Sequence, residues 1–171
     1  STTPPYSQTG KAKFNDIAGR LPGDDTIYYD ISWCMNVGPK IDPEYNRLFH
    51  IVHNVRCQIL DYIRFRLSQN LSLRGCDVDA FAQSLLRAQG LGSCIMHRTG
   101  HSIGHECHGI GANLDDYETH DDRQLLPGTM FSVEPGVYTG EYGVRLEFDV
   151  HITPDRQVNI YGPIQDQILI I

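Results

Sequence analysis

Apolar residues recur at helical spacing through the first half of the chain. Between Asp42 and Leu67 an apolar side chain returns every three or four positions, at Leu48, Val52, Val55, Ile59, Ile63 and Leu67. Asp42 can cap the start of this segment, Pro43 suits the first helical position, and Glu44 complements the positive end of a helix. The pattern therefore predicts a helix that ends near Leu67.

A second, shorter helix is predicted to begin near Asp77. Gly90 is a suitable stop for it, and its apolar side carries Val78, Phe81, Leu85 and Leu86. Ahead of the first helix, two runs have the composition of strands, Ala12–Asp16 and Thr26–Met35. Residues 19–25 between these runs are rich in turn-forming types, so the two runs are expected to form a hairpin.

Beyond Gly92 the pattern changes to turns and β-branched residues. Met130–Tyr138 is typical of strand, turn and strand around Pro135-Gly136, and Val144–Ile152 alternates between apolar and polar positions. In that alternation one face carries Val144, Leu146, Phe148 and Val150, and the other carries Arg145, Glu147, Asp149 and His151. Gln157–Tyr161 is expected to pair with this strand, and Gln167–Ile171 to form a last one. Two helices before a run of strands predict an α+β fold with mostly antiparallel pairing.

The charge balance argues against two classes of partner. The chain has 21 acidic and 14 basic residues, a net charge of −7, and no run rich in Lys or Arg. It therefore lacks the basic face that nucleic acid or an anionic membrane would require. No apolar run is long enough to span a bilayer, and the first 14 residues lack the apolar stretch of a signal peptide. At 171 residues the chain fits one domain, residues 1–171, with a sizeable core.

Five scattered cysteines form no CxxC pair: Cys34, Cys57, Cys76, Cys94 and Cys107. This usage suits free thiols in a reducing compartment, so the cytoplasm is the expected location. For Cys34, Cys107 and Trp33 the sequence favours simple packing.

Histidines gather in one short stretch, where four of the chain's eight fall between His97 and His108. A zincin protease would need HExxH on a helix, but His105-Glu106-Cys107-His108 is one residue short. Glycines at positions 100, 104 and 109 also oppose a regular helix and favour a turning backbone close to a ligand. The stretch is therefore expected to form one part of a larger site.

Four acids lie in or beside the expected strands: Asp16, Asp30, Glu134 and Glu147. Taken singly, each is expected on an exposed strand face, because an acid in an apolar strand is either solvent-facing or paired. Gathered together without a metal, the four carboxylates would repel one another and shift toward protonation. Such a cluster is therefore expected to hold cations.

With His101 these acids follow an order that resembles the two-metal site of the pita-bread metallopeptidases. That family includes methionine aminopeptidase, aminopeptidase P and prolidase. The resemblance covers the chain from about Gly10 to Ile171 and rests on five stretches: GKAKFND with Asp16, YYDISW with Asp30, HRTGHSIG with His101 and a later His108, SVEPGVY with Glu134, and GVRLE with Glu147. The histidine and GVRLE stretches look closer to aminopeptidase P and prolidase than to methionine aminopeptidase.

The resemblance implies a pita-bread fold, a curved and mostly antiparallel sheet covered by helices. It implies two divalent cations held by Asp16, Asp30, His101, Glu134 and Glu147. Mn²⁺ suits so oxygen-rich a set best, with Zn²⁺, Co²⁺ or Fe²⁺ as alternatives. The implied reaction is hydrolysis of a peptide bond next to proline by metal-activated hydroxide, as in an Xaa-Pro aminopeptidase or dipeptidase. The implied partners are a proline-containing peptide substrate and a second copy of the chain in a homodimer.

Other residues receive roles by the same resemblance. Glu134 would also relay the proton of the attacking water. His97 and His108 would donate hydrogen bonds to the substrate. Arg145 would orient an acid ligand or meet a substrate carboxylate, with an ion pair inside the sheet as the alternative. His105 is expected to be a bystander.

The chain departs from the family pattern at several positions. The interval between Asp16 and Asp30 is longer than usual, which a longer hairpin loop would accommodate, and Ser32-Trp33-Cys34 replaces the usual Thr-Arg-Thr. Phe148 stands where an acid is usual after Glu147, and the N-terminal part of the family fold is expected to be missing. Two alternatives stay open: a creatinase-like hydrolase that works without metal, and a catalytically silent binding domain.

Overall fold

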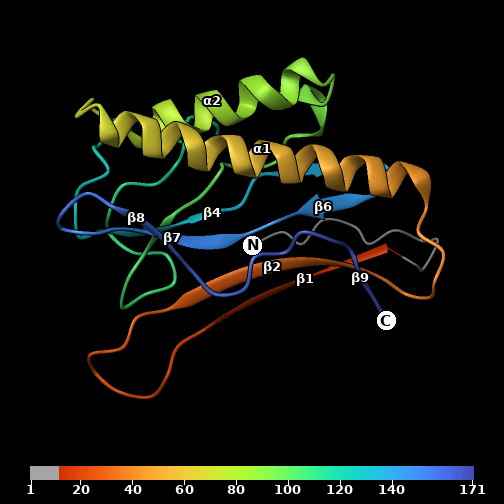
Figure 1. Ribbon diagram of the computed structural model, residues 1–171, viewed down its shortest axis with the longest axis horizontal. Helices are drawn as coiled ribbons and strands as arrows, with labels where there is room; N and C mark the ends of the chain where they lie inside the picture. Colours follow the sequence, from red (N-terminus) through yellow and green to blue (C-terminus); the bar gives the residue numbers. More distant parts are fainter. Residues whose placement is uncertain (1–11) are drawn as a thin grey trace.

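Two helices cover one face of a group of short sheets in the computed structural model, which describes residues 12–171 (Figure 1). Helix α1 spans Pro43–Ser68 and α2 spans Gly75–Ala88, so both predicted helices are confirmed. The Asp42 carboxylate caps α1 and accepts hydrogen bonds from the backbone of Glu44 at 2.8 Å and Tyr45 at 3.4 Å. Gly10 and Lys11, which belong to the first aspartate stretch, lie outside the described residues.

The strands of residues 12–171 form three small sheets, and their pairing is mostly antiparallel, as predicted. The first sheet has the order β1-β2-β9, with β1 at Ala12–Gly19, β2 at Tyr29–Asn36 and β9 at Leu169–Ile170. The second has the order β3-β4-β7-β8, with these strands at Ser102–Ile103, Met130–Val133, Phe148–Ile152 and Val158–Tyr161. The third pairs β5, Gly136–Tyr138, with β6, Gly143–Arg145. A short 3₁₀ turn, η1, spans Gly92–Cys94.

The first hairpin confirms the expected pairing of the two N-terminal runs. Its ladder is unbroken from Ala12 opposite Asn36 to Gly19 opposite Tyr29, so the long interval between Asp16 and Asp30 is taken up by the loop after β1. The ladder also places Asp16 directly opposite Ser32.

The prediction of one continuous strand over Val144–Ile152 is wrong, because Leu146 and Glu147 separate β6 from β7. Its polar face is also not exposed: Glu147 is 2% exposed and Asp149 is fully buried. Strand β2 lies against this face, since the Glu147 amide donates to the Ser32 carbonyl and the Asp30 amide donates to Asp149 Oδ2. Both faces of this segment are therefore buried: the apolar side chains point into the hydrophobic core, and the acidic side chains point toward β2.

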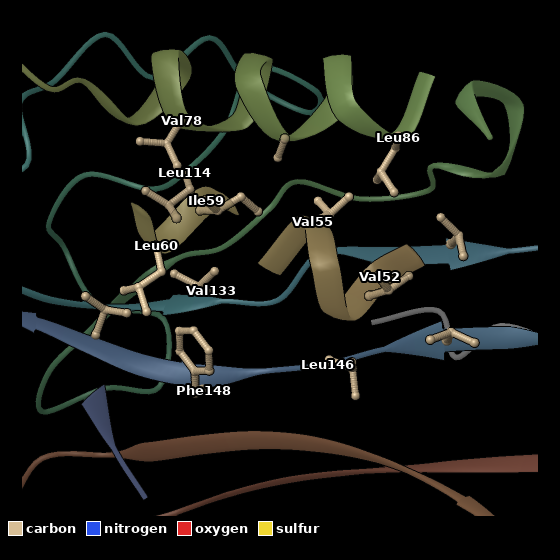
Figure 2. Packing of buried hydrophobic residues seen from close by; sticks show 14 of the residues in the cluster. Val52, Val55, Ile59, Leu60, Val78, Leu86, Leu114, Val133, Leu146 and Phe148 are labelled. Atoms are coloured by element: carbon tan, nitrogen blue, oxygen red, sulfur yellow. The ribbon is translucent and has the colours of Figure 1, made fainter. Parts of the chain in front are cut away.

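The apolar environment is the core between the helices and the second sheet (Figure 2). Val52, Val55, Ile59 and Leu60 of α1 and Val78 and Leu86 of α2 pack with Leu114, Val133, Leu146 and Phe148. Because strand side chains alternate, these apolar residues leave Glu147 and Asp149 facing β2. No helix within residues 12–171 is both long and apolar enough to cross a membrane.

Candidate metal centre

Four of the five proposed metal ligands lie together between β2 and the second sheet. Asp30 comes from β2, His101 precedes β3, Glu134 follows β4, and Glu147 precedes β7. His101 Nε2 lies 3.5 Å from Asp30 Oδ2 and 3.4 Å from Glu134 Oε1. One donor atom each of Asp30, His101 and Glu147 falls within 4.8 Å of the others. All four residues are buried, so three acids lie close together with the imidazole of His101.

Ser132 joins the histidine stretch to the first glutamate. Its hydroxyl accepts a hydrogen bond from the His101 amide at 2.9 Å and donates one to Glu134 Oε1 at 3.0 Å. The backbones also approach closely, because a Cβ on Gly100 would lie 2.0 Å from the Ser132 carbonyl oxygen. Only glycine fits this crossing. The glycine before His101 therefore lets the histidine reach the acid cluster.

Asp79 of α2 holds the backbone just before His101 in place through hydrogen bonds to Thr99. It is fully buried, and its Oδ1 accepts hydrogen bonds from the Thr99 amide at 3.0 Å and the Thr99 hydroxyl at 2.5 Å. Its Oδ2 accepts from the Gln83 side chain and the Asp116 amide. The Thr99 carbonyl in turn accepts from the Glu134 amide at 2.7 Å. Asp79, which the sequence analysis missed, thus positions the loop that carries His101 and Glu134.

Asp16, the fifth proposed ligand, lies at the rim with a half-exposed side chain. Its carboxylate forms an ion pair with Arg145 and lies 3.0 Å from the Ser32 hydroxyl. That hydroxyl also lies 2.7 Å from Glu147 Oε2 and accepts from Arg145 Nε at 3.0 Å. Arg145 Nε is 3.8 Å from Glu134 Oε2. Ser32 and Arg145 therefore connect Asp16 to the buried acids, and Arg145 forms the ion pair that was its alternative role.

Burial and mutual repulsion set the protonation of the acids. Burial raises the pKa of Glu134, and burial, Glu134 and Asp30 together raise the pKa of Glu147 well above its usual range. Burial also opposes ionisation of Asp30, but contacts with His101 and Cys107 outweigh it and lower its pKa. Burial disfavours protonation of His101, yet Asp30 and Glu134 raise its pKa. The glutamates therefore show the crowding expected of carboxylates gathered without a cation.

The cluster has buried oxygen atoms that no protein group satisfies. Asp30 Oδ1, Glu147 Oε1 and Asp149 Oδ1 lack a hydrogen-bond partner among the described residues, although buried polar atoms are nearly always paired. Burial, followed by the charge of Asp30, raises the pKa of Asp149 to about 7. Unsatisfied carboxylate oxygens beside one imidazole fit a hard divalent cation. The residues present therefore suit the metal that the resemblance implies. Asp149 was missed, although it lies two positions after Glu147 in the same alternation.

His97 is engaged away from the acids. Its Nδ1 lies 2.6 Å from the Arg98 carbonyl oxygen, so this nitrogen carries the proton. Its Nε2 then accepts from the Tyr138 hydroxyl at 2.8 Å. Burial lowers the pKa of His97 to about 4, which keeps the ring neutral. Nδ1 donates to the Arg98 carbonyl and Nε2 carries no proton, so donation to a substrate through Nε2 would require both the displacement of Tyr138 and a shift of the ring proton from Nδ1 to Nε2. The sequence analysis did not single out Tyr138.

The rest of the histidine stretch folds back over His101. The Gly109 amide donates to the Ser102 carbonyl at 2.7 Å, which closes the loop that contains His105, Cys107 and His108. The His108 and His101 rings meet edge to face with centroids 4.3 Å apart, and His108 is exposed. The Cys107 thiol donates to Asp30 Oδ2 at 3.1 Å, so the prediction of simple packing for this residue is wrong. The exposed His105 makes no such contact.

Residues 12–154 match the Metallopeptidase family M24. In sequence, the chain is 41% identical over 87 residues to a probable dipeptidase PepE of Mycobacterium tuberculosis, a match that covers 48% of this chain and 21% of that protein. It is 33% identical over 95 residues to the putative dipeptidase YkvY of Bacillus subtilis, covering 55% of this chain and 25% of that protein.

Solved structures of dipeptidases are also similar to this chain. Dipeptidase PepE from Mycobacterium ulcerans superposes with a TM-score of 0.78 at 25% identity, over 95% of this chain and 40% of that chain. The Xaa-Pro dipeptidase from Bacillus anthracis does so with a TM-score of 0.69 at 25% identity, over 85% of this chain and 38% of that one. The chain thus spans less than half the length of these relatives. These matches confirm the expected pita-bread fold, and the match over residues 12–154 shows that the chain belongs to metallopeptidase family M24.

Proposed function

We propose that the protein containing this chain is an exopeptidase that uses two divalent cations to hydrolyse the peptide bond next to a proline. The observation that carries the proposal is the buried cluster of Asp30, Glu134 and Glu147 around His101, with oxygen atoms that lack partners. A creatinase-like hydrolase without metal would have no use for these acids. Among the relatives, an Xaa-Pro dipeptidase and two dipeptidases agree with a peptide substrate.

The proposed cations are held by the four clustered residues and by Asp16. When bound, two cations polarise the scissile carbonyl and make a bound water acidic enough to react near neutral pH. Mn²⁺ is the proposed metal, because carboxylates provide four of the five ligands. Asp16 would have to leave its ion pair with Arg145 to join them. Release of Asp16 would free the Arg145 guanidinium to contact a substrate carboxylate.

Glu134 is the proposed proton relay. It is buried beside the other ligands, and its carboxylate can accept and return the proton of the attacking water. Its Oε1 receives the Ser132 hydroxyl and its Oε2 faces Arg145 Nε, so both oxygens are oriented. Replacement by glutamine would keep the shape and remove the proton acceptor.

His108 and His97 are the proposed contacts to the substrate. His108 is exposed beside His101, in a position to donate to a peptide bound over the cluster. His97 would act after its Nε2 loses the Tyr138 hydroxyl and the ring proton moves from Nδ1 to Nε2. A neutral imidazole can donate to the carbonyl of the bond that breaks and stabilise the charge that develops on it.

The test uses the full-length protein, loaded with Mn²⁺, and three peptides: an Xaa-Pro dipeptide, a longer peptide that begins Xaa-Pro, and a matched dipeptide without proline. Release of the N-terminal residue from either proline peptide is expected, and preference between them separates dipeptidase from aminopeptidase. Glu134→Gln should remove this activity and keep the fold. Hydrolysis of the proline-free dipeptide alone would contradict the proposed specificity. No hydrolysis of any peptide by the Mn²⁺-loaded protein would contradict the enzyme and favour a silent binding domain.

A further inference from the structure

Cys107 introduces a soft donor at the edge of a carboxylate site. Its Sγ lies 3.1 Å from Asp30 Oδ2, and donor atoms of Cys107, His101 and His108 all lie within 4.8 Å of one another. The loop closed by the Gly109–Ser102 hydrogen bond brings the thiol and the second imidazole back over His101. None of these contacts is needed by the proposed hydrolysis, for which Cys107 has no role.

The donors have the composition of a zinc site. One thiolate, two imidazoles and one carboxylate make up a four-ligand set, and sulfur favours Zn²⁺ over Mn²⁺. Ligand atoms around a tetrahedral zinc lie about 3.3–3.8 Å apart, given bonds of about 2.0–2.3 Å. The distances from Asp30 Oδ2 to Cys107 Sγ, 3.1 Å, and to His101 Nε2, 3.5 Å, are already close to that range. The three edges among Cys107, His101 and His108 would shorten by up to about 1.5 Å, which rotations of the exposed His108 ring and of the Cys107 side chain can supply.

We propose that this chain has a second, zinc-selective way of binding metal, through one thiolate, two imidazoles and one carboxylate: Cys107, His101, His108 and Asp30. On binding, the Cys107 S–H bond breaks, its proton leaves to solvent, and the sulfur–metal bond forms. Asp30 and His101 are also among the ligands of the proposed function, so the two arrangements exclude each other. If the proposed function holds, zinc bound through Cys107 is an inhibitor and Mn²⁺ an activator at overlapping sites.

The test is an absorbance titration of the reduced, metal-free, full-length protein with Co²⁺, which substitutes for Zn²⁺ and reports sulfur ligation by a charge-transfer band in the near ultraviolet. The band is expected to saturate at one Co²⁺ per chain and to disappear when Zn²⁺ is added. Cys107→Ser should abolish the band. His108→Ala should keep the band but weaken Co²⁺ binding at least about tenfold, since even outer contacts of a metal ligand are worth that much.

Cys57→Ser is the matched control. Cys57 is an exposed thiol on α1 whose Sγ lies 4.0 Å from His53 Nδ1, so these two residues form a second thiol–imidazole pair that could bind cobalt. The proposal expects Cys57→Ser to keep the band. No band at saturating Co²⁺, a band that survives Cys107→Ser, or one that Cys57→Ser removes would overturn it. The absorbance measurement does not depend on peptide hydrolysis. If the protein shows the cobalt band but cleaves no peptide, the proposed function is contradicted and the zinc site is not.

Discussion

Arg145 and Asp16 form an ion pair at the rim of the acid cluster, where Asp16 is half-exposed and Arg145 is largely buried. The guanidinium also approaches Glu134 and stacks over the Phe14 ring at 5.3 Å. In this arrangement Arg145 supplies the positive charge nearest to Asp16. A cation that recruits Asp16 must therefore compete with a protein side chain that pairs directly with it, whereas Glu134 meets the same guanidinium only at 3.8 Å.

Asp16→Asn is expected to reduce the bound metal from two ions per chain to one. The remaining ion should keep its affinity within about tenfold, because its ligands lie around His101 and do not include Asp16. Elemental analysis with calorimetric titration of Mn²⁺ measures both quantities. Asp24→Asn, in the exposed loop after β1, is the control and should bind two ions. A loss of one ion in Asp24→Asn instead would place the first ligand in the loop.

Asp149 should make the metal-free protein lose stability as the pH rises from about 4 to 7, and the buried neutral ring of His97, whose pKa is lowered to about 4, contributes an opposing gain over the lower part of this range. The pKa of Asp149 is raised to about 7 in the folded protein from an ordinary value of 3.8, so in this window the folded form holds a proton that the unfolded form has lost. The cost is about 4 kcal/mol of folding free energy for the full interval. Thermal unfolding against pH measures it. Asp149→Asn should remove this loss, so the free energy of unfolding of the variant should rise with pH relative to that of the parent protein, and an unchanged slope would contradict the role of this acid.

Asp79→Ala should destabilise the protein by about 3 kcal/mol, because the Thr99 hydroxyl, the Gln83 side chain and the Asp116 amide lose their buried acceptor, while the Thr99 amide keeps the Leu114 carbonyl. It should also weaken Mn²⁺ binding, since Thr99 no longer fixes the Glu134 backbone. Urea unfolding gives the first effect and metal titration the second. Asp61→Ala, an exposed acid on α1, is the control and should change stability by less than about 0.5 kcal/mol. Equal losses of stability and of Mn²⁺ affinity in the two variants would contradict the positioning role of Asp79.

His97→Ala should lower kcat/KM for an Xaa-Pro peptide by about a hundredfold, the usual loss when a donor to the developing charge is removed. Tyr138→Phe should change kcat/KM by less than about tenfold, because the hydroxyl only occupies His97 until substrate replaces it. Steady-state kinetics on the Mn²⁺-loaded, full-length protein compares the two variants. A larger loss in Tyr138→Phe than in His97→Ala would mean that the tyrosine itself acts on the substrate.

The helices and the first hairpin could be predicted because their signals are local. The three- and four-residue spacing of Leu48 to Leu67 and the Asp42-Pro43 start identify α1 without tertiary information. The order of Asp30, His101, Glu134 and Glu147 likewise placed these four residues in one site, and the structure brings them together.

What the sequence could not provide depends on contacts between distant segments. Polar residues at every second position, such as Glu147 and Asp149, occur both on strand faces exposed to solvent and on faces covered by another strand. Their burial under β2 could therefore be recognised only from the three-dimensional structure. Asp79 lies in an ordinary helix pattern, and its four hydrogen bonds come from residues up to 37 positions away. Cys107 meets Asp30 across 77 positions, a contact that only the closed loop over His101 produces.

Metal binding by the acids around His101 can be tested most directly by anomalous diffraction. Crystals of the full-length protein soaked in Mn²⁺, with data collected above the manganese absorption edge, are expected to show an anomalous peak among Asp30, His101, Glu134 and Glu147. A second peak is expected beside Asp16. Manganese peaks only at other positions, or none at saturating Mn²⁺, would contradict metal binding by these acids.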